Sequence, residues 1–86
     1  MNIDFTKSFN KQFEKLPAKK QKRTQSAIAL FIKDDSTLSL RNHTLKGKWV
    51  DYRSISAGGD LRLHFKRIGT NTILFVAVGT HSQLYK

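Results

Sequence analysis

The hydrophobic period of this chain changes near its middle, and this change limits the folds that the chain can adopt. In the first half, Phe5, Phe9, Phe13 and then Leu16 recur at helical spacing, which indicates an amphipathic helix. In the second half, apolar and polar residues alternate, as in strands that are buried on one face. Helices followed by strands predict an α+β domain, with two N-terminal helices packed on one face of a small antiparallel sheet.

Local signals set the bounds of the expected elements. Thr6 is a candidate N-cap for the first helix, and Pro17 suits the first turn of the second helix. Two aspartates at residues 34–35 end that helix, because carboxylates are unfavourable at its negative end. We therefore expect an edge strand at residues 3–5, helices at 7–15 and 17–33, and strands at 52–56, 61–67 and 72–78.

Charge is the strongest signal in the composition. The 86 residues include 16 Lys and Arg against 6 Asp and Glu, a formal net charge of +10. Such a field attracts polyanions, and we expect nucleic acid rather than a membrane surface, while an acidic protein partner is also possible. The length fits one domain over residues 1–86. The chain contains no cysteine and no apolar run long enough for a membrane span or a secretory signal, so we expect a cytoplasmic protein.

Apolar and basic side chains alternate along the strand expected at residues 61–67. Alternate side chains of a strand point to opposite faces, so one set packs on the helices and the other lies on the open face. The open face would then present a row of cationic and titratable groups and could form a concave working surface. The apolar set is Leu61, Leu63 and Phe65, and the polar set is Arg62, His64 and Lys66.

The register of the strand expected at residues 52–56 decides which of its side chains lie on the open face beside these basic groups. If the hairpin pairs simply around its two glycines, Arg53 and Ile55 share the open face with Arg62. If the glycines hold a bulge, Ser54 and Ser56 lie there instead. The sequence leaves both registers open.

Four short motifs in this order resemble the RelE/ParE superfamily of bacterial toxins, and most closely its YafQ-like branch. They are HTLKGKW at residues 43–49, YR at 52–53, GDLRL at 59–63 and GTHSQLY at 79–85. The resemblance implies a RelE-like microbial RNase fold and a small ribonuclease that cuts mRNA, usually in the ribosomal A site, with no metal or other cofactor. It also implies a cognate antitoxin that wraps the toxin and covers its site.

The resemblance also implies site residues. A histidine of the YafQ pattern maps onto His43, an acid onto Asp60, the C-terminal catalytic histidine onto His81 and a final aromatic onto Tyr85. An arginine of the RelE branch, which holds the scissile phosphate, maps onto Arg62. Arg53 matches a basic position, while Ser56 replaces a family histidine, and the nearby His64 is a candidate for the missing imidazole.

Metal-free RNA cleavage needs a base for the ribose 2′-hydroxyl, an acid for the leaving 5′-oxygen, and cations for the charge on phosphorus. His81 is the candidate acid, and Asp60 or His43 is the candidate base. Tyr85 could stack on a nucleobase. The candidate cations are Arg62 with Arg53, Lys46 and Lys48. Three widely separated histidines, without cysteine, make a poor metal site.

Simpler roles compete with these assignments. His43 could bind phosphate as a loop residue, Asp60 could serve only the turn, and Tyr85 and Trp49 could cover the edge of the core. Two other functions also remain: a non-catalytic DNA gyrase inhibitor like the ParE branch, and a degenerate toxin that binds RNA or antitoxin without cutting. A pure binder needs no imidazole at His81. For the partner, we expect an acidic and partly disordered antitoxin segment.

Overall fold

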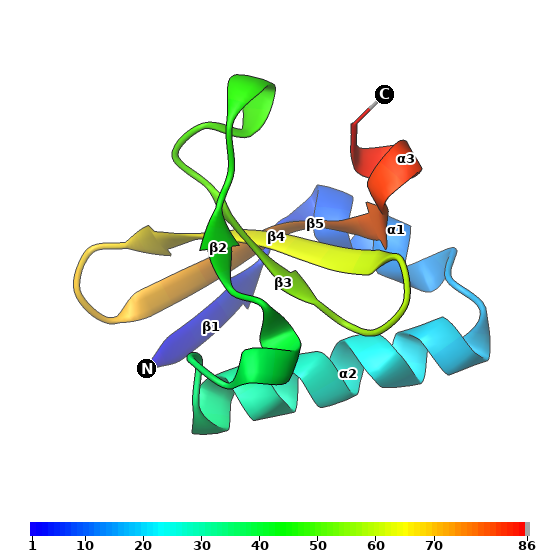
Figure 1. Ribbon diagram of the computed structural model, residues 1–86, viewed down its shortest axis with the longest axis horizontal. Coiled ribbons are helices and arrows are strands. Elements are labelled where there is room, and N and C mark those ends of the chain that lie inside the picture. Colours follow the sequence, from blue (N-terminus) through cyan, green and yellow to red (C-terminus); the bar gives the residue numbers. More distant parts are fainter. Residues whose placement is uncertain (86) are drawn as a thin grey trace.

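Five strands form one sheet in the order β1-β5-β4-β3-β2, and α2 lies across one of its faces (Figure 1). The computed structural model describes residues 1–85. The main elements are β1 (Asn2–Phe5), α1 (Lys7–Glu14), α2 (Ala18–Lys33), β2 (His43–Thr44), β3 (Arg53–Ser56), β4 (Leu61–Ile68), β5 (Thr72–Thr80) and α3 (His81–Leu84). Of the two 3₁₀ turns, η1 (Leu38–Leu40) lies between α2 and β2, and η2 (Gly47–Trp49) lies between β2 and β3. The α+β class and both N-terminal helices are confirmed.

The helix ends follow their local signals. The Thr6 hydroxyl accepts a hydrogen bond from the Phe9 amide at 3.1 Å, which caps α1 as predicted. Pro17 is the N-cap of α2, one position before the first turn, and the helix stops at Asp34, where the backbone becomes extended. None of the helices within residues 1–85 has the length and apolarity to cross a bilayer.

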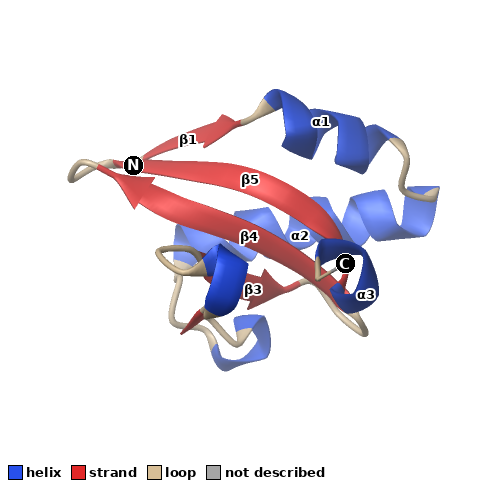
Figure 2. Cartoon of the chain, turned by 90° about the horizontal axis from the view of Figure 1, so that it is seen from above, coloured by secondary structure: helices blue, strands red, loops and turns tan. Residues whose placement is uncertain are grey.

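The sheet is mostly antiparallel, as predicted, and within residues 1–85 its one parallel pairing is between β1 and β5. The edge strand β1 runs parallel to β5, with Asn2 opposite Thr72. A short edge segment carries no sequence signal for its direction, so this direction could not be predicted. Beyond β1, α1 continues beside the second half of β5 (Figure 2). There the Gln12 side-chain oxygen accepts a hydrogen bond from the Val78 amide at 2.9 Å. This backbone donor of β5 therefore has a partner where β1 has ended.

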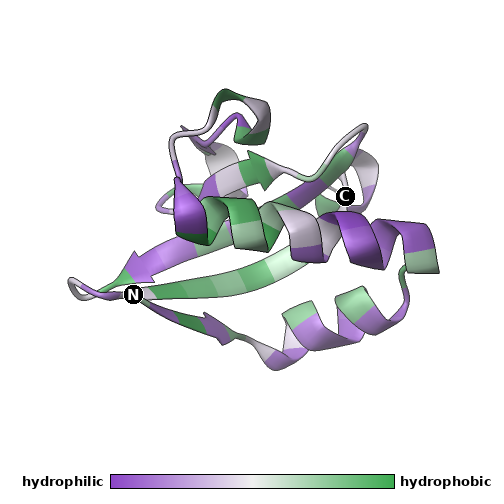
Figure 3. Cartoon of the chain, turned by 90° about the horizontal axis from the view of Figure 1, so that it is seen from below, coloured by the Kyte–Doolittle hydropathy of each residue, from purple (hydrophilic) through white to green (hydrophobic). Residues whose placement is uncertain are grey.

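Three phenylalanines make the centre of the core, between α2 and the sheet. Phe31 on α2 meets Phe65 and Phe75 edge-on at ring distances of 4.9 and 5.7 Å, and all three are fully buried. Leu61, Leu63 and Phe65 thus face the helix layer as the alternation predicted. Only the second half of α2 supplies apolar side chains to this layer, and its first half is hydrophilic (Figure 3). The opposite face of the sheet remains for other contacts.

Candidate active site

The hairpin between β3 and β4 adopts the second of the two possible registers. Ser54 pairs with His64 and Ser56 with Arg62, so these four side chains share the face opposite α2. The turn reaches this register with both glycines in the left-handed region, at φ +96° for Gly58 and +52° for Gly59.

This register moves Arg53 away from the open face, which corrects its predicted place on the working surface. Arg53 pairs with the core residue Phe65 and therefore lies on the helix side of the sheet. Its Nε donates a hydrogen bond to the Asn42 side-chain oxygen at 2.8 Å. Arg53 is thus separated from the histidines by the sheet itself.

The far end of the hairpin brings two predicted residues to the same end of the sheet. Leu61 pairs with Thr80, so Asp60 just before one strand and His81 just after the other are neighbours along the edge. Both side chains are exposed. Asp60 is available as a proton acceptor there, and His81 as a proton donor.

The chain turns sharply after β5 and forms a helical turn that was not predicted. Thr80 and Gln83 make a reciprocal capping box: the Thr80 amide donates to Gln83 Oε1 at 2.8 Å, and the Gln83 amide to Thr80 Oγ1 at 3.3 Å. His81 is the first residue of this turn, α3. The capping box therefore fixes where the imidazole leaves the sheet.

Arg62 is held in place by its own hairpin. Its Nη1 lies 3.2 Å from the Ser56 hydroxyl, 2.8 Å from the Gly59 carbonyl oxygen and 2.9 Å from the Leu61 carbonyl oxygen. Ser56 thus serves as an anchor for the guanidinium. A cation fixed in this way needs little rearrangement to stabilise a developing phosphate charge.

A row of aromatic rings connects the C-terminal turn to the loop before β3. His81 stacks on Tyr85 at 4.4 Å, Tyr85 meets His64 at 5.6 Å, and His64 meets Trp49 edge-on at 4.4 Å. Trp49 also meets Tyr52 at 5.4 Å. Sequence reasoning assigned Trp49 only a covering role, although the residue lies within one of the four motifs.

His64 is fully buried beneath Trp49 and Tyr85, which corrects its predicted role as a substrate-binding residue. Both of its ring nitrogens lack a hydrogen-bond partner among the described residues. Burial, together with repulsion from His43 and His81, lowers the pKa of His64 to about 4. The imidazole is therefore neutral at pH 7 and has no direct access to a substrate.

His43 lies on the same row of the sheet, because it pairs with Ser54, which in turn pairs with His64. Its Nδ1 is 2.6 Å from the Arg41 carbonyl oxygen. A carbonyl only accepts hydrogen bonds, so Nδ1 carries the hydrogen and Nε2 remains free to take a proton. The exposed His43 side chain has the tautomer that a general base requires.

Two lysines flank this face on the loop before β3. Lys46 is the exposed N-cap of η2, and the Lys48 ammonium lies 6.0 Å from the centre of the Trp49 ring. Tyr85 remains 37% exposed beside His81, so part of its ring is accessible for stacking. Within residues 1–85, no group of three or more His, Asp or Glu side chains could hold a metal ion.

The chain resembles known toxins in sequence pattern and in fold. A family model described as the bacterial toxin of type II toxin–antitoxin system, YafQ, matches residues 1–86. YafQ from E. coli is 21% identical and superposes with a TM-score of 0.80, covering 99% of this chain and 98% of that chain.

Two solved complexes also contain a similar chain. The E. coli DinJ–YafQ complex matches at 22% identity and a TM-score of 0.77, over 99% of this chain and 97% of the other. The RelB–RelE complex from Methanococcus jannaschii matches at 25% identity and a TM-score of 0.73, over 96% and 95%. A search of curated proteins found no match. Because the family model spans the whole sequence, the chain belongs to the YafQ family of toxins of bacterial type II toxin–antitoxin systems.

Proposed function

We propose that this toxin is an endoribonuclease that cuts mRNA in the ribosomal A site and thereby stops translation. The observation that carries the proposal is the pairing of Leu61 with Thr80, which gathers Asp60, Arg62 and His81 at one end of the sheet. An acid, a base candidate and a fixed cation at one exposed edge are the groups that RNA cleavage needs.

The proposed reaction is an attack of the ribose 2′-oxygen on the adjacent phosphorus. Asp60 or His43 Nε2 takes the 2′-hydroxyl proton as the new P–O bond forms. The P–O5′ bond breaks, and protonated His81 gives its proton to the departing 5′-oxygen. The products are a 2′,3′-cyclic phosphate and a free 5′-hydroxyl, and no metal ion takes part.

The remaining residues of the face have supporting roles in this proposal. Arg62 stabilises the charge that grows on the phosphate oxygens, and Lys46 and Lys48 attract the RNA backbone. Tyr85 stacks on a nucleobase next to the scissile phosphate, a contact worth about 1–3 kcal/mol in single-strand binding proteins. His64 is placed beneath them as a support for Tyr85 and His81.

We further infer that an acidic cognate antitoxin binds this toxin and covers the same face. Two solved structures with this fold are complexes of a toxin with an antitoxin, and a chain of net charge +10 favours an acidic partner. The partner can be identified as the product of the neighbouring gene, if that product copurifies with the toxin. The association rate should then fall as the salt concentration rises.

Pulse labelling after brief induction separates the ribonuclease from a gyrase inhibitor. The proposal predicts that incorporation of labelled amino acids stops first, while incorporation of thymidine continues. If thymidine incorporation stops first, the toxin acts on DNA replication and the ribonuclease assignment is wrong. Continued incorporation of both labels would identify a toxin that has lost its activity.

A further inference from the structure

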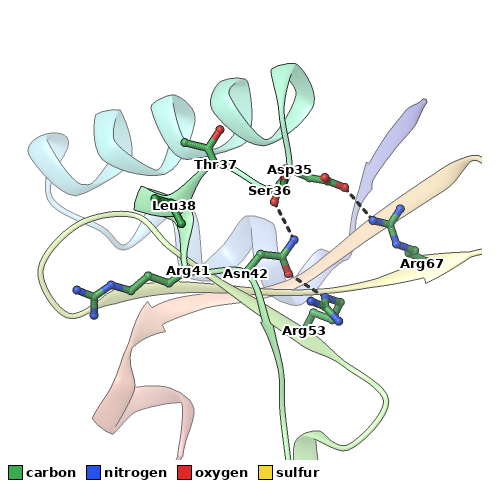
Figure 4. Close-up of a pocket in the computed structure, with 8 residues that line it drawn as sticks. All are labelled: Asp35, Ser36, Thr37, Leu38, Arg41, Asn42, Arg53 and Arg67. Carbon is green, nitrogen blue, oxygen red and sulfur yellow. Dashed lines mark hydrogen bonds and ion pairs between the residues drawn. The ribbon is translucent and has the colours of Figure 1, made fainter.

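A second basic site lies on the helix side of the sheet. Here the end of α2, η1 and strands β3 and β4 enclose a cavity of about 420 Å³ (Figure 4). The residues of its wall that matter here are Asp35, Leu38, Arg41, Asn42, Arg53 and Arg67. We call this cavity the rear pocket.

Internal contacts hold the charged wall of the rear pocket in place. Arg67 forms an ion pair with Asp35 at 2.9 Å. The Asn42 side chain donates to the Asp35 carbonyl oxygen at 3.0 Å and accepts from Arg53 Nε at 2.8 Å. Two guanidinium groups are thus oriented before any ligand binds, which lowers the entropic cost of binding.

The charges of the rear pocket do not cancel. Three arginines line it, and Asp35 is the only carboxylate among its lining residues. Within residues 1–85, neither a hydrogen bond nor an ion pair holds the Arg41 guanidinium, which extends away from Arg53 and Arg67 along the rim (Figure 4). Arg41 also adopts a left-handed backbone with φ +50°, uncommon for a residue with a side chain. The pocket therefore carries more positive charge than the Asp35 carboxylate neutralises.

An exposed leucine borders these cations. The Leu38 side chain is 93% exposed, more than any other large apolar side chain that the structure describes. Protein interfaces are enriched in arginine and combine it with apolar side chains. A phosphate would pair with the arginines equally well, but an RNA backbone would gain nothing by covering Leu38.

The Arg67 side of the rear pocket is remote from the end of the sheet that carries Asp60, Arg62 and His81. Arg67 and Leu61 lie near opposite ends of β4, six positions apart, which is about 20 Å along a strand. Arg67 faces Asp35 at the end of α2, whereas Arg62 and His64 face the other side of the sheet. A strand of RNA at His81 therefore leaves the rear pocket open.

We propose that the rear pocket binds an acidic segment of the antitoxin that carries an apolar side chain next to its carboxylates. The carboxylates pair with Arg41 and Arg53, and the apolar side chain covers Leu38. This proposal rests on the antitoxin part of the proposed function. The antitoxin would then contact both faces of the sheet: one segment covers the catalytic face, and another binds in the rear pocket.

Two variants test the rear pocket. Arg41→Asn removes the guanidinium and suits the left-handed backbone, because asparagine tolerates positive φ better than most residues. Leu38→Ser removes exposed apolar surface without changing charge. Lys22→Asn is the matched control, since it removes one exposed cation from the first half of α2. Thermal unfolding checks that all three variants fold.

The measured quantity is the dissociation constant of the purified antitoxin from each toxin variant, without RNA. We expect Arg41→Asn and Leu38→Ser each to weaken binding about tenfold, and Lys22→Asn to change it less than about twofold. The rate of RNA cleavage should stay at the parent value in Leu38→Ser and Lys22→Asn. Only Arg41→Asn should also reduce the salt dependence of binding.

Three results would overturn the proposal. Unchanged affinity in both variants would show that the antitoxin does not use the rear pocket. Unchanged antitoxin affinity with weaker RNA binding by Arg41→Asn would assign the pocket to a phosphate of RNA. Failure of the parent toxin to bind the antitoxin would refute the antitoxin part of the proposed function as well. A toxin that binds its antitoxin but cuts no RNA would refute only the ribonuclease.

Discussion

The indole N–H of Trp49 donates a hydrogen bond to the carbonyl oxygen of Leu84 at 3.0 Å, and so ties the loop before β3 to the C-terminal turn. The turn α3 is four residues long and has little stability as an isolated helix. Its position therefore depends on the capping box, on this hydrogen bond and on the rings of His64 and Tyr85. The orientation of His81 thus depends on local residues and also on Trp49 and His64, which are far away in the sequence.

Trp49→Phe should loosen α3 without unfolding the protein. The ring would keep its contact with His64, while the loss of one hydrogen bond costs about 1 kcal/mol. We expect faster hydrogen exchange at the Tyr85 amide, which bonds to the His81 carbonyl oxygen, and RNA cleavage slower by about tenfold in kcat with a smaller change in KM. Tyr52→Phe is the control, because it keeps the other ring that contacts Trp49. Parent-like exchange and kcat in Trp49→Phe would show that Trp49 does not position α3.

His64 should make the fold sensitive to acid. Its pKa is about 4 in the folded protein and about 6.5 when unfolded, so the unfolded chain takes up a proton first as pH falls. The free energy of unfolding should decrease through this window by about 3 kcal/mol relative to a variant without the imidazole, and the decrease should level off below pH 4.

His64→Leu provides that variant. It removes two buried nitrogens without partners, so we expect it to raise the stability at pH 7 by about 1–3 kcal/mol. Urea unfolding of the parent and of His64→Leu, at several pH values from about 4 to 7, measures the difference. Parallel pH curves for the two proteins would mean that His64 is not the group that titrates.

Arg62→Ala should lower the rate of cleavage far more than the affinity for RNA. The hairpin holds the guanidinium, and in the proposed reaction it stabilises the charge that grows in the transition state. The loss of one such donor costs about 10²–10³-fold in kcat. Lys22→Ala, which removes an exposed cation of α2, should change mainly the salt dependence of binding. Single-turnover cleavage with RNA titrations separates the two effects. Similar small losses in both variants would reduce Arg62 to a general surface cation.

The local parts of this fold could be predicted from the sequence because their causes are local. The cap at Thr6, the stop at Asp34 and the alternation from Leu61 to Phe65 each depend on a few neighbouring residues, and the structure confirms them. The direction of β1 has no such local signal, and neither did the sequence motifs indicate the short turn α3. Its capping box, Thr80 with Gln83, directly follows a strand, so the sequence alone did not predict a helix there.

The candidate site was harder to predict because it depends on register and on distant contacts. Arg53 left the open face because the glycine turn selected the other register. His64 lies on the predicted face but is buried, because Trp49 from η2 and Tyr85 from the end of α3 both pack on it. Alternation predicts the face of a side chain, whereas its exposure depends on what packs there.

Mapping of cellular mRNA 5′ ends shows whether His81 is the general acid of an mRNA endonuclease. The measurement compares brief induction of the parent toxin with induction of His81→Ala, at equal protein levels and with antitoxin binding as the check on folding. We predict new 5′-hydroxyl ends within coding regions for the parent and a loss of at least about 10²-fold in their abundance for His81→Ala. The same ends at parental abundance from a folded His81→Ala toxin would show that His81 is not the general acid.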